Sequence, residues 1–261
     1  MTGKLYVIGV GPGDPELLTL KSVRILKETQ CIFVPKGREE GTSLALSIMR
    51  GAVDLDGKKI VELHFPMMKT APHPPKEAPP QTGQAGTLPR GEREALQADD
   101  LNAKWNEAVH AIVPVLEQGR DAAFITIGDP GIYSTFFYLY DRLLELRPAL
   151  VIEIVPGISS INAAAARAGL YLGLGNERIA ILPANYLDSL EETLEKFDTV
   201  VLMKVSKVFT TVRDMLNRMN RAAQATYVVR AGMDDERVYR DIGQVNEEEA
   251  NYFSLMIVRK R

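Results

Sequence analysis

A glycine-rich turn near the start of the chain combines residue types that are suited to binding a small ligand. The segment reads Gly9-Val10-Gly11-Pro12-Gly13-Asp14-Pro15 and follows a short apolar run. Glycines let a backbone approach a ligand closely, and Asp14 adds a carboxylate where the next helix is expected to begin. The turn predicts either a tight strand–helix connection capped by an aspartate or one wall of a ligand cleft.

The spacing of these glycines disfavours a nucleotide phosphate as the ligand. A dinucleotide fingerprint needs a glycine three residues after Gly11, and Asp14 stands there instead. Its carboxylate would repel a pyrophosphate, and no Lys-Ser or Lys-Thr pair follows, as a P-loop requires. The apolar run 31–34 also ends without the acidic residue that would bind a ribose.

Two further turns of the same kind follow later apolar runs. One is Gly128-Asp129-Pro130, and the other is Val155-Pro156-Gly157-Ile158-Ser159-Ser160. Because ligands of parallel sheets bind at the carboxyl ends of the strands, the three turns are expected to converge. Together they predict a cleft with small residues, backbone donors and two carboxylates, which suits a cationic or zwitterionic ligand.

The elements that must position these turns alternate between strands and helices. Short, nearly continuous apolar runs between amphipathic stretches are typical of a mostly parallel sheet covered by helices. Strands are expected at 5–10, 31–34, 59–63, 122–127, 151–155, 179–182, 199–203 and 225–230, with late, antiparallel strands at 237–242 and 252–259. Helices are expected at 15–28, 42–49, 103–117, 133–146, 159–168, 187–196 and 208–219. We therefore predict two α/β domains, 1–156 and 157–261.

Residues 72–91 form a proline-rich insertion in the first domain. The segment holds six of the 15 prolines and cannot build a strand ladder or a core. It is expected to be a mobile loop, either a plain insertion or a lid or docking segment.

Composition excludes several classes of protein. The net charge of −3, from 31 basic and 34 acidic residues, provides no overall positive field for nucleic acid or an anionic membrane. No apolar run is long enough to span a bilayer and the first residues do not resemble a signal peptide, so we expect a cytoplasmic protein. The single cysteine, Cys31, is expected to be buried. None of the three histidines stands at metal-ligand spacing, so no protein-bound metal is expected.

Several segments together resemble the tetrapyrrole methylase family, which uses S-adenosylmethionine. The segment 10–19, the Gly128-Asp129-Pro130 turn followed by Tyr133, and the segment 155–160 are similar to three family motifs in the right order. The resemblance covers nearly the whole chain except 72–91. It implies two α/β domains with mostly parallel sheets, a ligand cleft between them, and a homodimer.

The resemblance also implies which residues bind the methyl donor. Met203 stands where the family has a methionine that contacts adenine, and Ala231 stands where the family's backbone contacts the edge of the adenine. Without the resemblance, Met203 would be interpreted as a core side chain. The full set implied by the motifs is Pro12, Gly128, Asp129, Ile132, Ser159, Ser160, Met203 and Ala231.

Within the family, four segments resemble the enzymes that methylate C-20 of precorrin-2 or cobalt-factor II in cobalamin biosynthesis. These segments are 34–38, 41–45, 65–67 and 173–178. Two alternatives stay open: a methylase of the same family with another acceptor (uroporphyrinogen, another corrinoid position, or diphthine on a protein), and a non-enzymatic module that senses a metabolite.

The expected chemistry needs alignment more than a nucleophile. A sulfonium already activates its methyl group, so the protein must align the substrate carbon and exclude water. Asp14 and Tyr133 are the candidates for contacting the ring system or its proton. The substrate carries many carboxylates, so basic side chains beside the expected strand ends are candidates for binding it, if they are not plain surface charges: Lys36, Arg38, Lys204, Lys207 and Arg230.

Overall fold

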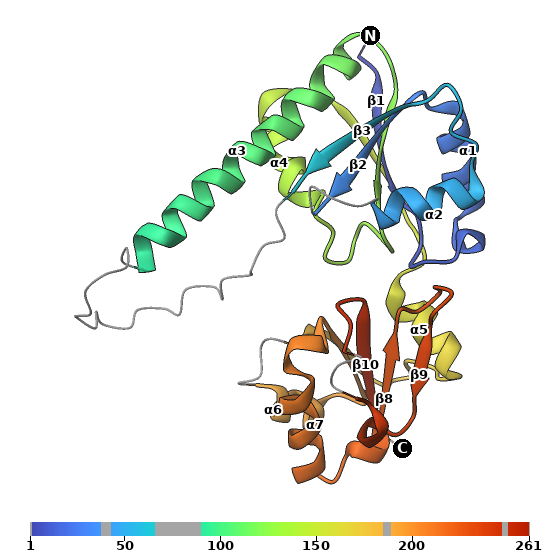
Figure 1. Ribbon diagram of the computed structural model, residues 1–261, viewed down its shortest axis with the longest axis vertical. Helices are drawn as coiled ribbons and strands as arrows, with labels where there is room; N and C mark the ends of the chain where they lie inside the picture. Colours follow the sequence, from blue (N-terminus) through green and yellow to red (C-terminus); the bar gives the residue numbers. More distant parts are fainter. Residues whose placement is uncertain (1, 38–42, 66–89, 185–188, 247–249, 261) are drawn as a thin grey trace. The chain divides into compact units, whose positions relative to one another are not determined.

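The computed structural model describes residues 2–37, 43–65, 90–184, 189–246 and 250–260, and within 90–101 only the backbone. Contacts between residues divide the chain into two compact units (Figure 1). Unit 1 comprises Met1–Ile8, Leu20–Thr126 and Tyr133–Val155. Unit 2 comprises Gly9–Thr19, Ile127–Ile132 and Pro156–Arg261.

Unit 1 is built on a five-stranded sheet of order β3-β2-β4-β1-β5. The pairings β2/β3, β2/β4 and β1/β5 are parallel. In Figure 1, α1 and α2 lie on one side of this sheet, and α3 and α4 lie on the other. The strands are β1 (Lys4–Gly9), β2 (Cys31–Lys36), β3 (Lys59–His64), β4 (Ala122–Thr126) and β5 (Val151–Val155). The helices are α1 (Leu20–Glu28), α2 (Leu44–Ala52), α3 (Arg90–Glu117) and α4 (Phe137–Leu146).

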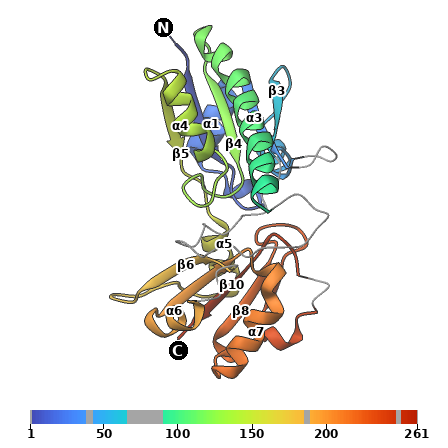
Figure 2. The same ribbon diagram turned by 90° about the vertical axis from the view of Figure 1, so that its left-hand side faces the viewer.

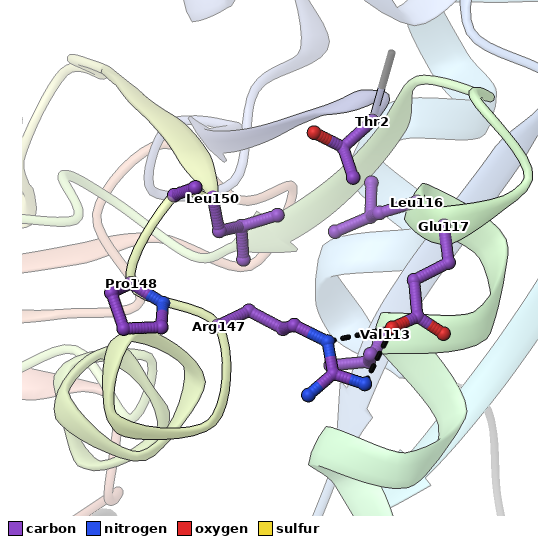
Figure 3. A pocket seen from close by; sticks show the side chains of 8 residues that line it. Thr2, Val113, Leu116, Glu117, Arg147, Pro148 and Leu150 are labelled. Carbon is purple, nitrogen blue, oxygen red and sulfur yellow. Dashed lines mark hydrogen bonds and ion pairs between the residues drawn. The ribbon is translucent and has the colours of Figure 1, made fainter.

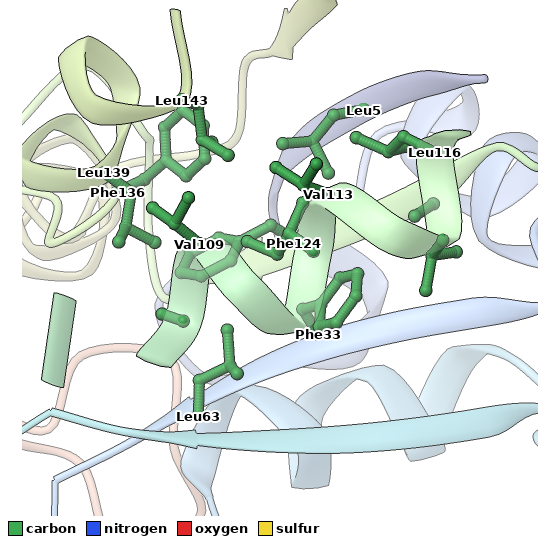
Figure 4. Packing of buried hydrophobic residues seen from close by; sticks show 14 of the residues in the cluster. Leu5, Phe33, Leu63, Val109, Val113, Leu116, Phe124, Phe136, Leu139 and Leu143 are labelled. Atoms are coloured by element: carbon green, nitrogen blue, oxygen red, sulfur yellow. The ribbon is translucent and has the colours of Figure 1, made fainter. Parts of the chain in front are cut away.

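The core between this sheet and the helices α3 and α4 follows from the spacing of apolar residues. Val109, Val113 and Leu116 share one face of α3 and are buried against the strand residues Phe33 and Phe124 (Figure 4). Each such side chain contributes about 1.5–3 kcal/mol through burial. The expected parallel sheet covered by helices is therefore confirmed for this unit.

Unit 2 contains a second five-stranded sheet, of order β6-β7-β10-β8-β9. Strands β6 and β7 pair in parallel, and β10 runs antiparallel to both β7 and β8, so β6, β7 and β8 point in one direction. The late strands β9 and β10 are antiparallel to β8, as predicted. The strands are β6 (Ile179–Pro183), β7 (Thr199–Met203), β8 (Ala225–Val229), β9 (Arg237–Tyr239) and β10 (Ser254–Arg259).

Alternation along these strands gives unit 2 two apolar layers. Val200 and Leu202 belong to a cluster with the helices α6 (Leu190–Lys196) and α7 (Phe209–Arg218). Val201, between them in the sequence, belongs to a second cluster with α5 (Ser160–Ala168). Figures 1 and 2 show the helices of this unit around its sheet. The described part of this unit also contains the short 3-10 helices η1 (Pro15–Leu17), η2 (Val205–Val208), η3 (Ala222–Gln224) and η4 (Ile242–Gln244).

Several sequence expectations differ from the structure. The helix expected at 133–146 begins at Phe137, and Tyr133 has a positive φ. The helix expected at 15–28 is interrupted, because Leu18 is extended between η1 and α1. The helix expected at 103–117 begins at Arg90, since residues 92–101 are mostly helix formers, so the last two residues of the expected insertion are helical. The rest of 72–91 lies outside the described residues. The turns 9–19 and 127–132, expected in the first domain, group with unit 2.

Two features of the described residues disfavour particular functions. Among the helices that the structure describes, none is long and apolar enough to cross a membrane. Cys31 is buried in β2, and this burial raises the pKa of its thiol, so it is a poor nucleophile at neutral pH.

Glu153 joins two lysines in unit 1, and we expect this contact to make stability depend on pH. The Nζ atoms of Lys21 and Lys4 lie 2.6 and 2.8 Å from its carboxylate oxygens. Hydrogen bonds from Lys21 and Lys4 lower the pKa of Glu153 from 4.5 to about 2. The stabilisation is therefore complete above about pH 4.5 and is lost as the pH falls toward 2.

Urea unfolding of Glu153→Gln checks this expectation. At pH 6 the variant should be less stable than the wild type by about 1 kcal/mol, and the difference should shrink as the pH falls below 4. Glu28→Gln, which breaks the exposed pair with Arg24, is the control and should cost less than about 0.5 kcal/mol. A Glu153→Gln difference that is the same at pH 6 and pH 3 would contradict the assignment.

Candidate functional site

Three glycines bring the three turns together inside unit 2. A Cβ atom on Gly9 would lie 2.5 Å from the Gly128 carbonyl oxygen and 2.8 Å from Gly157 Cα. The Gly128 N–H donates to the Gly11 carbonyl oxygen at 2.7 Å, and both residues have positive φ, +71° and +78°. The backbones of the three turns are thus in direct contact; Gly9 leaves no room for a Cβ atom, and Gly11 and Gly128 have backbone conformations that favour glycine.

Asp129 ties the second turn to the third. Its Oδ1 accepts a hydrogen bond from the Gly131 N–H at 2.7 Å, and its Oδ2 accepts one from the Gly157 N–H at 2.9 Å. The carboxylate therefore holds its own turn in shape and also holds the start of the segment that leads into α5. The backbone of Gly128 and Asp129 is what this turn can offer to a ligand.

The turn after β8, where the sequence analysis placed Ala231, joins the same group through Gly232, which the sequence analysis did not name. A Cβ atom on Gly13 would lie 2.6 Å from the Gly232 carbonyl oxygen, and Pro12 Cγ lies 3.3 Å from the Cβ position of Gly232. The Gly232 N–H donates to Glu236 Oε2 at 2.6 Å, and this oxygen lies 3.3 Å from Nε of Arg167 in α5. The available signal was a glycine three residues after the buried strand β8.

One apolar cluster contains residues from several of these segments. Ile132, Met203 and Ala231, which come from three different segments, pack in or against this cluster with residues of α5. The strand register brings Met203 and Ala231 near one another, since Met203 of β7 and Val228 of β8 both lie opposite Leu255 of β10. The ends of β7 and β8 therefore lie at the same edge of the sheet.

Helix α5 begins beside these turns and offers backbone donors. Ser159 caps the helix, since its Oγ accepts a hydrogen bond from the Asn162 N–H at 3.3 Å. The N–H groups of Ser160 and Ile161 lie in the first turn, where the helix itself supplies no acceptor. The positive end of the helix dipole favours a carboxylate there.

All eight predicted donor-binding residues thus belong to unit 2, and the structure links them through shared backbone contacts, hydrogen bonds or one apolar cluster. The two predicted catalytic residues are placed differently. Asp14 Oδ1 accepts a hydrogen bond from the Glu16 N–H at 2.8 Å and caps η1. Tyr133 is half-exposed and groups with unit 1.

Two of the predicted basic residues already have carboxylate partners. Lys36 Nζ lies 2.8 Å from Glu62 Oε2. Arg230 pairs with Asp235 and, by its hydrogen bond, lowers the pKa of that carboxyl group. Lys204 follows β7 and Lys207 lies in η2, while Arg38 lies outside the described residues. A substrate role for this set stays a prediction.

Backbone strain occurs at three of the predicted positions. Among the described residues, four that are not glycine have positive φ: Asn220, Tyr133 (+53°), Lys204 (+57°) and Arg230 (+53°). Such a conformation costs about 1–2 kcal/mol and is concentrated at functional sites. The strain therefore supports the choice of the loops after β4, β7 and β8.

A cavity of about 120 Å³ in unit 1 does not belong to this site (Figure 3). Its lining is largely apolar, with Thr2 and Leu150 just before β1 and β5, and the Arg147–Glu117 ion pair beside it. It therefore lies at the amino ends of these strands and contains none of the predicted residues. In the part of the chain that the structure describes, no three His, Cys, Asp or Glu side chains are grouped closely enough to hold a metal ion.

Comparisons with known sequences identify relatives along almost the whole chain. A 35% identical relative from Methanocaldococcus jannaschii, named "Probable cobalt-precorrin-2 C(20)-methyltransferase", aligns over 98% of this chain and 96% of its own. The cobalt-precorrin-2 C(20)-methyltransferase of Salmonella typhimurium is 30% identical, and the alignment covers 100% of this chain and 98% of that protein. The precorrin-2 C(20)-methyltransferase of a Sinorhizobium species is 28% identical, and the alignment covers 98% of this chain and 95% of that protein.

Solved structures share the fold. A cobalt precorrin-4 methyltransferase matches with a TM-score of 0.68 at 18% identity, over 98% of this chain and 94% of its own. Another match is the uroporphyrin-III C-methyltransferase of Thermus thermophilus complexed with S-adenosylhomocysteine. Its TM-score is 0.58 at 21% identity, and the match covers 99% of this chain and 98% of that chain. The family model of the tetrapyrrole (corrin/porphyrin) methylases matches residues 4–245. On this match and these relatives, the chain belongs to the tetrapyrrole methylases.

Proposed function

We propose that this protein is an S-adenosylmethionine-dependent methyltransferase that methylates C-20 of precorrin-2 or of its cobalt form in cobalamin biosynthesis. The observation that carries this proposal is the pair of relatives, 35% and 30% identical over nearly the whole chain, whose names state that activity on cobalt-precorrin-2. The convergence of the glycine turns in unit 2 supports it from the structure.

The residues at the converging turns fit such a donor. A Cβ atom on Gly128 would meet only Ser159 Cα and Ser160 N, at 3.9 Å, so space adjoins the glycine beside the start of α5. The first-turn N–H groups of α5 suit the carboxylate of an amino acid. The apolar wall formed by Ile132, Met203 and Ala231 suits an adenine ring.

The chemistry assigns modest tasks to the protein. When bound, S-adenosylmethionine supplies a methyl group that its sulfonium has already activated. The backbone of the turns around Gly11 and Gly128 orients that group, and the apolar wall excludes water. The electron-rich C-20 carbon of the substrate would take the methyl group as the carbon–sulfur bond breaks and S-adenosylhomocysteine is released. The C-20 proton would then pass to a base, and Asp14 and Tyr133 are the candidates for moving it.

A methyl-transfer assay tests the proposal. Protein is incubated anaerobically with ¹³C-methyl-labelled S-adenosylmethionine and, separately, precorrin-2, cobalt-factor II, precorrin-4 and uroporphyrinogen III. We expect one labelled methyl group by mass spectrometry on a precorrin-2-type ring, assigned to C-20 by carbon NMR. Labelling of precorrin-4 or uroporphyrinogen alone would move the activity to another position. Binding of the donor without any transfer would support the sensing module instead.

The same assay tests the predicted catalytic pair. Asparagine at position 14 can still cap η1 through Oδ1, so Asp14→Asn removes a proton-accepting carboxylate with little change in stability. If Asp14 Oδ2 or Tyr133 Oη moves the C-20 proton, Asp14→Asn or Tyr133→Phe should lower kcat about a hundredfold.

Asp241→Asn is the matched control for Asp14→Asn. Asp241 caps η4 in the same way, by accepting a hydrogen bond from the Gly243 N–H at 2.9 Å. This variant should keep the wild-type rate. Unchanged kcat in both Asp14→Asn and Tyr133→Phe would remove both residues from the mechanism.

We also propose that the enzyme is a cytoplasmic homodimer. The dimer is the state that the family resemblance implies, and light scattering should give twice the 28.9 kDa of one chain. Elution as a 28.9 kDa species at micromolar concentration would contradict the dimer. Cell fractionation tests the location.

A further inference from the structure

Three aromatic rings form a stacked row in unit 1. The Phe65 and Trp105 rings lie 4.6 Å apart between centroids at 27°, and the Trp105 and Tyr138 rings lie 5.2 Å apart at 26°. Phe65 and Trp105 are 5% and 3% exposed, whereas Tyr138 is 53% exposed. The row therefore begins in the core and ends with a ring that has one face on Trp105 and half of its surface in solvent.

The row lies at the edge of the sheet where parallel α/β proteins bind ligands. Phe65 follows the last residue of β3 directly, and its N–H donates to the carbonyl oxygen of Lys36, the last residue of β2, at 2.9 Å. Tyr138 is in the first turn of α4, the helix that follows β4. The outer ring is thus carried by an element that starts from the carboxyl edge.

The helix that carries the outer ring is fixed against the helix that carries the middle ring. Arg142, one helical turn after Tyr138, donates to Asn106 Oδ1 at 2.9 Å and to Asn102 Oδ1 at 2.6 Å, both in α3. Asn106 is next in sequence to Trp105, so these bonds fix α4 against the part of α3 that carries the middle ring. A ring that is already ordered loses little conformational entropy when a ligand binds.

From this arrangement we propose that Tyr138 is a substrate-binding residue whose outer face stacks on the conjugated face of the tetrapyrrole. The inference rests on the proposed function for the identity of the substrate. A single exposed tyrosine is common on protein surfaces. What distinguishes Tyr138 is that two buried rings stack behind it in nearly parallel planes, an arrangement that one more flat ring system continues.

The test compares substrate affinity in three variants at position 138. Stacking of a flat ring on an aromatic side chain commonly changes affinity by one order of magnitude or more. Tyr138→Leu keeps an apolar contact with Trp105. It should raise the KM for the tetrapyrrole substrate about tenfold and leave kcat within about twofold of the wild-type value. Tyr138→Ala should behave similarly. Tyr138→Phe keeps the ring and should retain the wild-type KM.

Tyr171→Ala is the matched control. Tyr171 is 50% exposed and also has one face covered, by the Arg259 guanidinium at 3.8 Å, but it lies in unit 2. It should change neither KM nor kcat. The affinity for S-adenosylhomocysteine, measured by calorimetry, should be unchanged in all four variants, because a damaged fold would weaken donor binding as well.

Trp105 provides a second readout because it is the only tryptophan in the chain. A tetrapyrrole stacked on Tyr138 would sit one ring away from it, so titration of the wild type and Tyr138→Phe with cobalt-factor II or precorrin-2 should strongly quench its fluorescence. A wild type that neither transfers methyl nor shows quenching would overturn the proposed function and this inference with it. An active wild type with unchanged KM in Tyr138→Leu and Tyr138→Ala would overturn the stacking inference alone.

Discussion

Replacing Gly157 by alanine should lower the affinity for S-adenosylhomocysteine at least a hundredfold and the free energy of unfolding by about 3 kcal/mol. The added Cβ would lie 2.8 Å from Gly9 Cα, and closer still to the Gly128 carbonyl oxygen. Both obstacles are backbone atoms of neighbouring turns and cannot rotate away as a side chain would. The turns must therefore separate, which is a severe form of overpacking.

Two other glycines distinguish crowding from backbone strain. Gly57 has a φ of +74° and nothing within 4 Å of its Cβ position, so Gly57→Ala should cost about 1 kcal/mol without changing donor affinity. Gly128 has a φ of +71° and meets only atoms at 3.9 Å. Gly128→Ala should therefore have a stability cost near that of Gly57→Ala, but it should weaken donor binding because its methyl group enters the space beside Ser159 and Ser160.

Calorimetry with S-adenosylhomocysteine and urea unfolding provide the measurements, and circular dichroism verifies that each variant is folded. A folded Gly157→Ala with wild-type affinity would show that the convergence of the turns is not the donor site. Equal losses of affinity in Gly157→Ala and Gly57→Ala would show that the effect is one of general stability.

The second large effect is expected at Asp129. Asp129→Ala removes the acceptor of two backbone N–H groups, those of Gly131 and Gly157. A backbone donor left without a partner costs about 1–3 kcal/mol, and the partial exposure of this turn lets water replace some of the loss. We expect a loss of about 2 kcal/mol in stability and about thirtyfold in donor affinity.

Asp129→Asn separates the two hydrogen bonds. The amide keeps one acceptor oxygen and so should retain one of the two bonds, with a loss of donor affinity below about tenfold. Asp54→Ala is the control, since Asp54 accepts a similar bond from the Asp56 N–H at 3.0 Å in an exposed turn of unit 1. It should leave donor binding unchanged. Loss of stability without loss of affinity in Asp129→Ala would contradict a role of this turn in binding the donor.

Local features were predictable because they depend on neighbours in the sequence. Strands and helices alternate as the apolar periodicity indicates, and the turns after β1, β4 and β5 stand where glycines follow apolar runs. Errors arose where local preferences conflict: Leu18 interrupts the helix expected at 15–28, and Tyr133, expected in a helix, has a positive φ. The boundary between the units was harder to predict, because contacts between turns far apart in sequence define it.

The sequence by itself determined the family, the order of elements and the set of residues expected at the donor site. Only the tertiary structure decided how these side chains are used. Asp129 bonds to Gly157 across 28 positions, and Lys36 pairs with Glu62 because β2 and β3 lie side by side. The turn of Gly232, held by Glu236 and Arg167, joined the site in the same way. Hydrogen bonds and ion pairs need atoms within about 3–4 Å, and such distances between remote residues arise only when strand register and loop packing are set.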